Sequence, residues 1–247
     1  NGIVANIGAG TIIDSEGFTD TVNITEINRG RLELRANDNA DDITGFEGRD
    51  SFIGRGGNDT MDGAGGFDKV RFDRSGYSGS VDLDFEAGTA TGTYDGNAFT
   101  YTLSNIEMAQ SGDGDDTLRG SDGADEWFTG NGGDDVIDGR GGTQDGVYTH
   151  VNQADATLTA LSDGSGLILS SSYGNDTLTS IEILEFMDGE VAVGDLFGGA
   201  QDLKGGGGNE TFQGALGDDT IAGLNGNDTL RGGMGNDLVK GGKDEDV

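Results

Sequence analysis

Thirteen acidic residues recur along the chain at a step of about nine residues, and their carboxylates are the first candidates for chemistry. They are Asp41, Asp50, Asp59, Asp68, Asp116, Asp125, Asp135, Asp145, Glu210, Asp219, Asp228, Asp237 and Asp246. Each is the sixth residue of a nine-residue unit such as GRGGNDTMD at residues 54–62. Carboxylates in turns that also present backbone carbonyls favour a hard cation with six to eight oxygen ligands, Ca²⁺ before Mg²⁺.

Two other positions of the unit are nearly as regular as the acid. The fourth is glycine in eleven of the thirteen units, departing only at Asn39 and Asp244. The eighth is apolar in every complete unit, for example Ile43, Phe52, Met61, Val70, Leu118, Trp127, Ile137, Phe212, Ile221, Leu230 and Val239. The first six residues are turn formers, and glycine permits backbone conformations that are closed to other residues. Each unit therefore predicts a tight turn followed by a short strand.

The units form three arrays with segments of a different character between them. Their first residues are Ala36, Gly45, Gly54 and Gly63, then Ser111, Gly120, Gly130 and Gly139, and finally Gly205, Gly214, Gly223, Gly232 and the truncated Gly241. The second array requires one inserted residue at Thr129 and another near Gln144. We predict arrays at 36–71, 111–148 and 205–247, the last truncated, preceded by spacers at 1–35, 72–110 and 149–204.

The spacers alternate apolar and polar residues, as half-buried strands do. Val81, Leu83 and Phe85 alternate with acids, and a second alternating run follows at residues 99–103. The spacers also resemble one another, because TLSNIE at 102–107 matches TLTSIE at 177–182 and, more loosely, TVNITE at 21–26. No stretch has helical periodicity with caps, so we predict an all-β fold.

The composition limits what the chain can bind. Asp and Glu number 46 against 14 Lys and Arg, a formal charge of −32, and only 32% of residues are hydrophobic. Such a chain is repelled by nucleic acid and by anionic membranes, and it stays disordered unless its charge is neutralised. Cysteine is absent, which excludes disulfides and thiolate metal sites. No apolar run is long enough to span a bilayer, and we read the chain as part of a larger protein.

Folding of the arrays should therefore depend on the cation. Each unit buries about one apolar side chain, and the free energy gained is small beside the entropic cost of ordering nine residues, several of them glycine. Stacked carboxylates add mutual repulsion. Bound cations would remove the repulsion and connect successive turns, so that binding free energy becomes folding free energy.

Catalysis within the chain is not indicated. His150 is the only histidine, and a Ser-His-Asp triad would have to be built around it without a recognisable nucleophile elbow. With 46 acids, pairs of carboxylates that could cleave a glycosidic bond arise by chance. We interpret His150 as an ordinary strand or surface residue. We expect Trp127 to lie in the core and Phe128 to lie outside as a small apolar patch.

At these residues the chain resembles the RTX, or haemolysin-type calcium-binding, repeats of secreted bacterial proteins, whose unit is G-G-x-G-x-D-x-U-x. GAGGFDKVR at 63–71 and GLNGNDTLR at 223–231 both follow it. The resemblance covers about half of the chain. It implies a right-handed parallel β-roll, a β-solenoid in which two consecutive units make one coil. It also implies calcium between the turns of units two apart, on either edge.

The resemblance further implies which residues hold calcium, with two carbonyls and one acid coming from each turn. Carried onto this sequence, the ligands in the first array are Asp41, Phe46, Gly48, Asp50, Gly54, Gly56, Asp59, Gly63, Gly65 and Asp68. In the second they are Gly112, Gly114, Asp116, Gly123, Asp125, Gly130, Gly132, Asp135, Gly139, Gly141 and Asp145. In the third they are Gly206, Gly208, Glu210, Ala215, Gly217, Asp219, Gly223, Asn225, Gly226, Asp228, Gly232, Met234, Asp237, Gly241 and Asp246. Pairing them gives about seven Ca²⁺ ions.

The resulting hypothesis is a non-catalytic, calcium-binding structural module of an extracellular bacterial protein. By resemblance it leaves the cell unfolded through type I export machinery and folds outside, secreted or at the cell surface. Two alternatives stay open. One is the C-terminal part of a secreted protease, lipase or alginate-modifying enzyme. The other is a surface-layer or adhesin assembly module, with self-association or a cell-surface polysaccharide as its partner.

Overall fold

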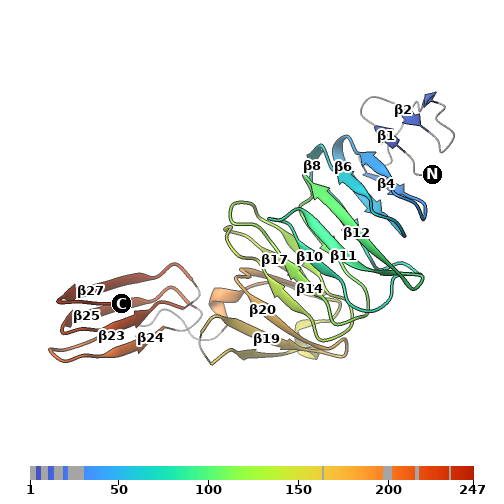
Figure 1. Cartoon of the computed structure of the whole chain (residues 1–247). Helices are drawn as coiled ribbons and strands as arrows, with labels where there is room; N and C mark the ends of the chain where they lie inside the picture. Colours follow the sequence, from blue (N-terminus) through green and yellow to red (C-terminus); the bar gives the residue numbers. More distant parts are fainter. Residues whose placement is uncertain are drawn as a thin grey trace. The chain divides into compact units, whose positions relative to one another are not determined.

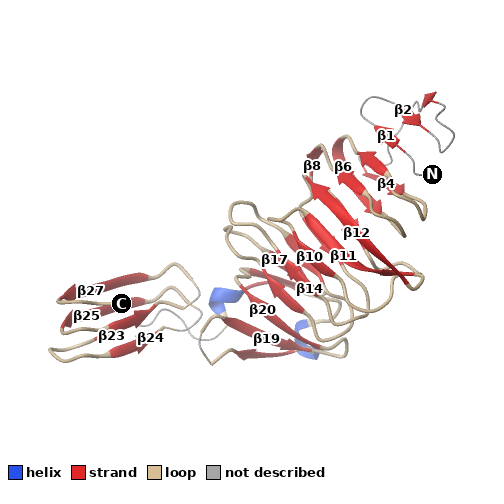
Figure 2. Cartoon of the chain, viewed as in Figure 1, coloured by secondary structure: helices blue, strands red, loops and turns tan. Residues whose placement is uncertain are grey.

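The computed structural model describes residues 4–6, 11–13, 19–21, 31–162, 164–196, 202–214, 217–233 and 235–247. The described part is all-β, with short strands joined by turns (Figures 1 and 2). The chain falls into two compact units, Asn1–Thr143 and Gln144–Val247. The first holds the first array, the spacer at 72–110, which we call the first spacer, and most of the second array.

The strands of the first unit lie in two sheets between which the chain alternates. Sheet B is all parallel, in the order β15 (Trp127–Thr129), β13 (Met108–Gln110), β9 (Lys69–Arg71), β6 (Glu47–Ile53) and β4 (Arg31–Arg35). In sheet A the order is β16 (Val136–Asp138), β14 (Thr117–Arg119), β10 (Asp82–Asp84), β11 (Thr89–Tyr94), β12 (Asn97–Ser104), β7 (Thr60–Asp62), β5 (Asp42–Thr44), β1 (Val4–Asn6), β2 (Thr11–Ile13) and β3 (Thr19–Thr21). The two-residue strand β8 (Gly65–Gly66) pairs with β6. This alternation is that of a solenoid roll.

Strand register fixes the length of one coil. Asp42 of β5 pairs with Thr60 of β7, eighteen residues later, so two nine-residue units make one coil as expected. In the second array Thr117 pairs with Val136, nineteen residues later, because one of its units contains an extra residue. Each coil thus adds one strand to each sheet, and equivalent residues stack at the strand spacing of about 4.8 Å.

The core is a file of single side chains between the two sheets. A three-residue strand directs its middle residue inward and its outer two outward. The middle residues Met61, Val70, Leu118 and Ile137 are all 0% exposed, while their neighbours in the strands are half-buried or exposed. The eighth-position column of the sequence is therefore the core of the roll.

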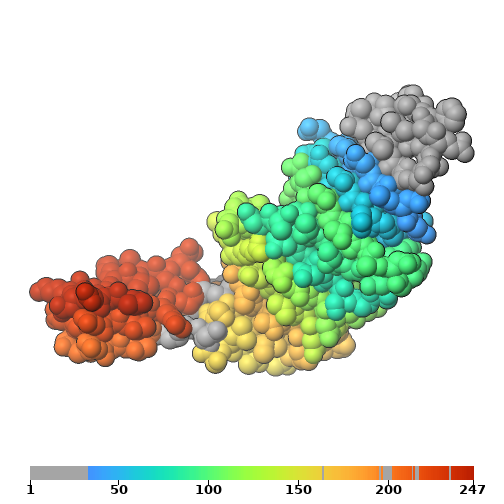
Figure 3. Space-filling view, in the orientation of Figure 1, coloured from blue at the N-terminus to red at the C-terminus, as the bar shows by residue number. Residues whose placement is uncertain are grey.

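The first spacer is built into the roll and joins the two arrays. Sheet B runs directly from β9 to β13, whereas sheet A inserts the antiparallel strands β10, β11 and β12 between β7 and β14. The alternation predicted for β12 is present, since Phe99, Tyr101 and Leu103 are buried and the residues between them are exposed. On the face drawn in Figure 3 the first array and this spacer form one unbroken surface.

In the second unit the spacer at 149–204, which we call the second spacer, again combines an antiparallel meander with a parallel pair of strands. Strands β18 (Thr157–Ala160), β19 (Gly166–Ser170) and β20 (Asn175–Thr179) are antiparallel. β17 (Gly146–Tyr148) pairs in parallel with β21 (Ile183–Phe186), which pairs with β22 (Gly189–Ala192). Two short 3₁₀ turns, η2 (Gln153–Asp155) and η3 (Val193–Asp195), accompany them. No helix among the described residues is long and apolar enough to cross a membrane.

The third array forms a short roll of parallel strands with the same eighteen-residue step. β23 (Asp202–Lys204), β25 (Thr220–Asn225) and β27 (Leu238–Lys243) make one sheet, and β24 (Thr211–Gln213) and β26 (Thr229–Arg231) make the other. Ile221 in the middle strand is fully buried, but Val239 in the outer strand is 43% exposed. The core of this roll is accordingly thin.

The structure corrects the predicted register of the unit that begins at Gly120. Its strand β15 has Phe128 in the middle, 0% exposed, whereas Trp127 is only half-buried. The extra residue thus lies in the turn before Glu126 and not at Thr129, which is the last, buried residue of the strand. Both interpretations of the aromatic pair were wrong, because the strand must direct its central side chain inward whichever ring is larger.

This register can be tested by removing the two aromatic side chains in turn. We expect Phe128→Ala to lower the free energy of unfolding by about 3–5 kcal/mol, the usual cost of deleting a buried aromatic side chain. Trp127→Ala should cost clearly less, since its ring is partly in water. Urea unfolding in saturating calcium measures both, and a larger loss for Trp127→Ala would refute the register.

Candidate metal centres along the edges of the roll

The turns that join the sheets form two edges of the roll. In the first unit the turns from sheet A to sheet B (residues 45–50, 63–68, 104–107 and 120–126) form what we call the A-to-B edge. The return turns (36–41, 54–59, 72–81, 111–116 and 130–135) form the B-to-A edge. Turns on one edge stack one coil apart, and each array turn ends at a sixth-position acid. The predicted metal ligands therefore gather on these edges.

Glycine is required at two positions of these turns. At the first position a methyl group on Gly45 would overlap Asp50 Oδ2 and lie 2.9 Å from the carbonyl oxygen of Gly63 in the next coil. At the fourth position Gly57 and Gly133 have φ of 101° and 111°, which a residue with a side chain rarely adopts. Glycine at the first position thus leaves room for an acid and a carbonyl oxygen from the next coil to converge.

The sixth-position acids form ladders along each edge. In each pair one coil apart, the backbone N–H of the earlier acid donates a hydrogen bond to one carboxylate oxygen of the later acid, over 2.7–3.1 Å. The pairs are Asp41–Asp59, Asp50–Asp68, Asp116–Asp135, Glu210–Asp228, Asp219–Asp237 and Asp228–Asp246. Six of the seven predicted pairs of turns are thereby brought together. For the seventh pair, which ends at Asp145, the two acids lie in different units.

In several turns the second-position amide also caps the acid of the same turn. The second-position amide of Phe46 donates to Asp50 Oδ2 over 2.7 Å, and that of Asn37 donates to Asp41 Oδ2 over 2.8 Å. The amide of Gly206 makes the equivalent bond to Glu210 Oε2 over 3.3 Å. These three carboxylates are therefore held in place by backbone donors from their own turns.

These carboxylates are buried, and several have one oxygen that accepts no hydrogen bond. Asp50, Asp59, Asp68 and Asp228 are at most 2% exposed. Each has one buried oxygen without a hydrogen-bond partner, namely Asp50 Oδ1, Asp59 Oδ2, Asp68 Oδ2 and Asp228 Oδ2. A buried carboxylate oxygen without a donor is costly, and a cation at that oxygen removes the cost. This is the observation that makes the turns fit a metal.

Burial also changes the acidity of the carboxyls. It raises the pKa of Asp59 and of Asp68 to about 7, and that of Asp116 to about 6. Backbone hydrogen bonds from Asp41, Asp50 and Val81 oppose this effect, while the charges of neighbouring acids reinforce it for Asp59 and Asp68. The metal-free carboxylates are thus strained by desolvation and by one another.

The donor set is oxygen from carboxylates and main chain. No group of three or more acidic or histidine side chains that could hold a metal occurs among the described residues, so any site here needs carbonyls as well. Oxygen-only sites of that kind suit calcium. Several predicted carbonyl ligands already accept a hydrogen bond; the Gly48 carbonyl, for example, accepts one from the Phe67 amide over 3.1 Å. Its second lone pair remains for a cation.

Some predicted ligands need correction or lie outside the description. Asp125 is exposed, where it accepts a hydrogen bond from the Thr143 amide. Glu126 takes the buried acid position, is 2% exposed and accepts from the Ser121 amide. The extra residue in this turn displaces Asp125 from the edge. Ala215 and Met234 lie outside the described residues.

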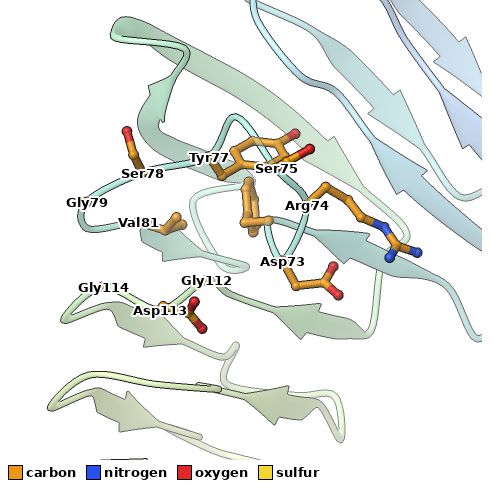
Figure 4. A pocket seen from close by; sticks show the side chains of 11 residues that line it. Asp73, Arg74, Ser75, Tyr77, Ser78, Gly79, Val81, Gly112, Asp113 and Gly114 are labelled. Atoms are coloured by element: carbon orange, nitrogen blue, oxygen red, sulfur yellow. The ribbon is translucent and has the colours of Figure 1, made fainter.

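The B-to-A edge is interrupted by the first spacer. The Val81 amide donates to Asp116 Oδ1 over 2.6 Å, so an apolar residue occupies the place of the earlier acid. The loop before it and the turn 112–114 enclose a cavity of about 480 Å³ (Figure 4). Its side chains include Asp73, which is paired with Arg71, and the exposed Asp113. At this step the loop supplies no acid at position six.

In the first unit the A-to-B edge continues into the spacer, which sequence reasoning missed, because Asp68 donates its amide to Glu107 Oε2 over 2.9 Å. Within the second unit Asp145 makes the equivalent bond to Glu182 Oε2 over 2.9 Å. Both glutamates end the T-L-x-x-I-E motif, whose recurrence was the available signal. His150, in contrast, is exposed, and its ring lies against Tyr173.

The role of first-position glycine can be tested in the third array. Gly214→Ala should lower stability by about 1–3 kcal/mol, the usual cost of overpacking, and weaken calcium binding, because the methyl group overlaps Asp219 Oδ2 and the Gly232 carbonyl. Gly207→Ala is the matched control, since nothing lies within 4 Å of its methyl group. Calcium-dependent thermal unfolding measures both, and equal losses would contradict the proposed crowding.

The raised pKa values predict how the metal-free chain responds to pH. The folded carboxyls of Asp59 and Asp68 titrate near 7 and the unfolded ones near 3.8. Between these values the folded chain binds more protons, so stability falls as pH rises through about 7. We expect chelator-treated protein to show more β circular dichroism at pH 5 than at pH 8. Asp59→Asn with Asp68→Asn should flatten this difference, and the exposed Asp95→Asn should not. Greater metal-free structure at pH 8 would refute the assignment.

Comparison with known proteins agrees with this geometry. The family model described as RTX calcium-binding nonapeptide repeat (4 copies) matches residues 35–70, 110–143 and 204–247. These ranges coincide closely with the three arrays. A search of curated proteins gave no match. The three arrays are therefore RTX calcium-binding nonapeptide repeats, as found in RTX-type proteins.

Proposed function

We propose that this chain is a calcium-dependent structural module of an extracellular bacterial RTX protein, which is exported unfolded and folds outside the cell. The observation that supports this most directly is the ladder of buried carboxylates, several with oxygens that have no donor. The repeats themselves identify the chain as a calcium-binding repeat module. The proposal of export and of an extracellular location is supported by the net charge of −32 and by the resemblance to secreted RTX proteins.

The ligand set that we propose is the one that the turns offer. Each site would take one acid from each of two turns one coil apart, with main-chain carbonyls from both. Asp50 and Asp68, joined over 2.7 Å, form one such pair, and Asp116 and Asp135 form another. Bound calcium would supply positive charge at the oxygens that lack donors. About seven ions would offset nearly half of the −32 charge.

This arrangement makes calcium concentration a switch for folding. Without the ion, adjacent carboxylates in the ladder repel one another in a buried setting, and the arrays gain little from their thin core. With it, folding is favoured by the binding free energy of every site. Extracellular calcium modules bind at roughly 10⁻⁴–10⁻³ M, so the chain would remain unfolded in the low calcium of a cytosol and fold on release.

We also propose that this chain itself carries no catalytic site. The repeats are structural, and the acids that sequence alone might offer to an acid–base mechanism are committed to the ladders by backbone hydrogen bonds. The histidine is on the surface beside a tyrosine ring. Any enzymatic activity of the larger protein would then belong to residues outside this chain.

Titration of calcium into the metal-free chain tests the proposal. At pH 7.5 we expect a cooperative gain of β circular dichroism near millimolar calcium and no comparable gain with magnesium, because Ca²⁺ accepts six to eight oxygen ligands whereas Mg²⁺ demands near-ideal octahedral geometry. Asp50→Asn with Asp68→Asn should shift the midpoint to higher calcium, whereas Asp95→Asn, at an exposed hairpin tip, should leave it unchanged. A chain that is fully folded at pH 7.5 without calcium would refute the switch.

A further inference from the structure

The first spacer continues the acid ladder of the A-to-B edge with a residue that no repeat supplies. Asp50 donates its amide to Asp68 over 2.7 Å, and Asp68 donates its own to Glu107 Oε2 over 2.9 Å. Glu107 follows a short turn after β12 and directly precedes β13, as each sixth-position acid precedes its strand. Glu107 therefore occupies the position of the next acid in the ladder.

The spacer also reproduces the neighbouring carbonyl. In the array, the carbonyl oxygen of Gly63 lies 2.9 Å from where a methyl group on Gly45 would be. One coil later, a methyl group on Gly63 would overlap the carbonyl oxygen of Asn105. Asn105 adopts a left-handed conformation, with φ of 51°, to bring its short turn there. Two of the ligands expected from a later turn, a carbonyl and an acid, thus have counterparts in the spacer.

A buried oxygen without a partner faces this step. Asp68 is 0% exposed, and its Oδ2 has no hydrogen-bond partner. A methyl group on Gly63 would overlap both that oxygen and the Asn105 carbonyl, so the two oxygens lie on the same side of the turn. Asp68 Oδ1, in contrast, accepts from Asp50 in the preceding coil. The oxygen without a partner accordingly points toward the spacer turn.

The same construction recurs in the second spacer. The Asp145 carbonyl accepts from the amides of Glu182 and Ile183, as the Asp68 carbonyl accepts from the amides of the equivalent residues, Glu107 and Met108. Ser180 has φ of 51°, the value found at Asn105. The isoleucines before the two glutamates are both buried. Two independent copies of T-L-x-x-I-E therefore place a glutamate carboxylate on the ladder in the same way.

We propose that Glu107 is a calcium ligand and that a cation site lies between the turns 63–68 and 104–107, formed by Asp68, Glu107 and the Asn105 carbonyl. Glu182 with Asp145 forms the second instance. The proposal rests on the proposed function, because it extends the same ladder beyond the repeats. The spacer turn is shorter than an array turn and lacks a third-position carbonyl, so water completes the coordination. Calcium would then fix the spacer hairpin to the array.

Counting calcium on the full chain tests this inference. Glu107→Gln keeps an oxygen that can accept from the Asp68 amide but removes the charge that binds the ion. We expect one calcium fewer per chain, by metal analysis at buffered free calcium and by the slope of unfolding stability against the logarithm of calcium concentration. Glu107→Gln with Glu182→Gln should lose two. The exposed Glu86→Gln and Glu190→Gln remove the same charge elsewhere and should lose none.

The outcomes separate this inference from the proposed function. If the unaltered chain binds no calcium, the proposed function fails. If it binds calcium and Glu107→Gln binds the same number with the same slope, only the spacer site is refuted. Should the variant not fold, the unaltered chain crystallised with a lanthanide decides the question. An anomalous peak between Asp68 and Glu107 supports the site, and peaks confined to array turns overturn it.

Discussion

The structure depends on stacking carboxylates one coil apart in an interior that excludes water. Strand pairing fixes the distance between coils, so an acid in every turn must lie close to the acids of the turns before and after it. Backbone amides satisfy one oxygen of each carboxylate, as the Asp41 amide does for Asp59, but they supply no net positive charge. Desolvation by burial raises the pKa of Asp59 and Asp68 despite these amide hydrogen bonds. The fold by itself leaves a charge imbalance, and a divalent cation is the group that corrects it.

This constraint explains why the rest of the unit is so uniform. First-position glycine leaves space for the acid and for the carbonyl of the next coil, and in turns such as those of Gly57 and Gly133 fourth-position glycine supplies a left-handed backbone. Only one inward side chain per strand remains to form a core. The chain is rich in glycine and acidic residues because each turn of the ladder requires them, although this composition is unfavourable for folding without a cation.

The sequence alone was sufficient for the repeat, and its resemblance to RTX repeats supplied the coil of two units and the pairs of acids that stack. It failed where two registers fitted equally well. Asp125-Glu126 and Trp127-Phe128 each offer the required residue type twice, so the pattern could not place the inserted residue. Because β15 must bury its middle residue, Phe128 occupies the core position and Glu126 occupies the sixth, acidic position. The spacer glutamates were missed because Glu107 follows a turn too short to keep the nine-residue step, although its motif recurs.

The two edges of the first unit differ in a way that follows from how the spacer crosses them. On the B-to-A edge the chain passes through a long loop that ends at Val81, and the hydroxyls of Tyr77 and Tyr101 bind the backbone of Arg55 in the last array turn. Neutral hydroxyl groups thus hydrogen-bond the backbone at the end of this ladder, where a further carboxylate would otherwise add charge. On the A-to-B edge a short turn returns with Glu107, and the ladder continues. The ladder of carboxylates on the B-to-A edge therefore ends at the spacer, whereas the ladder on the A-to-B edge continues from the array into the spacer. The same inserted hairpin interrupts one ladder and extends the other.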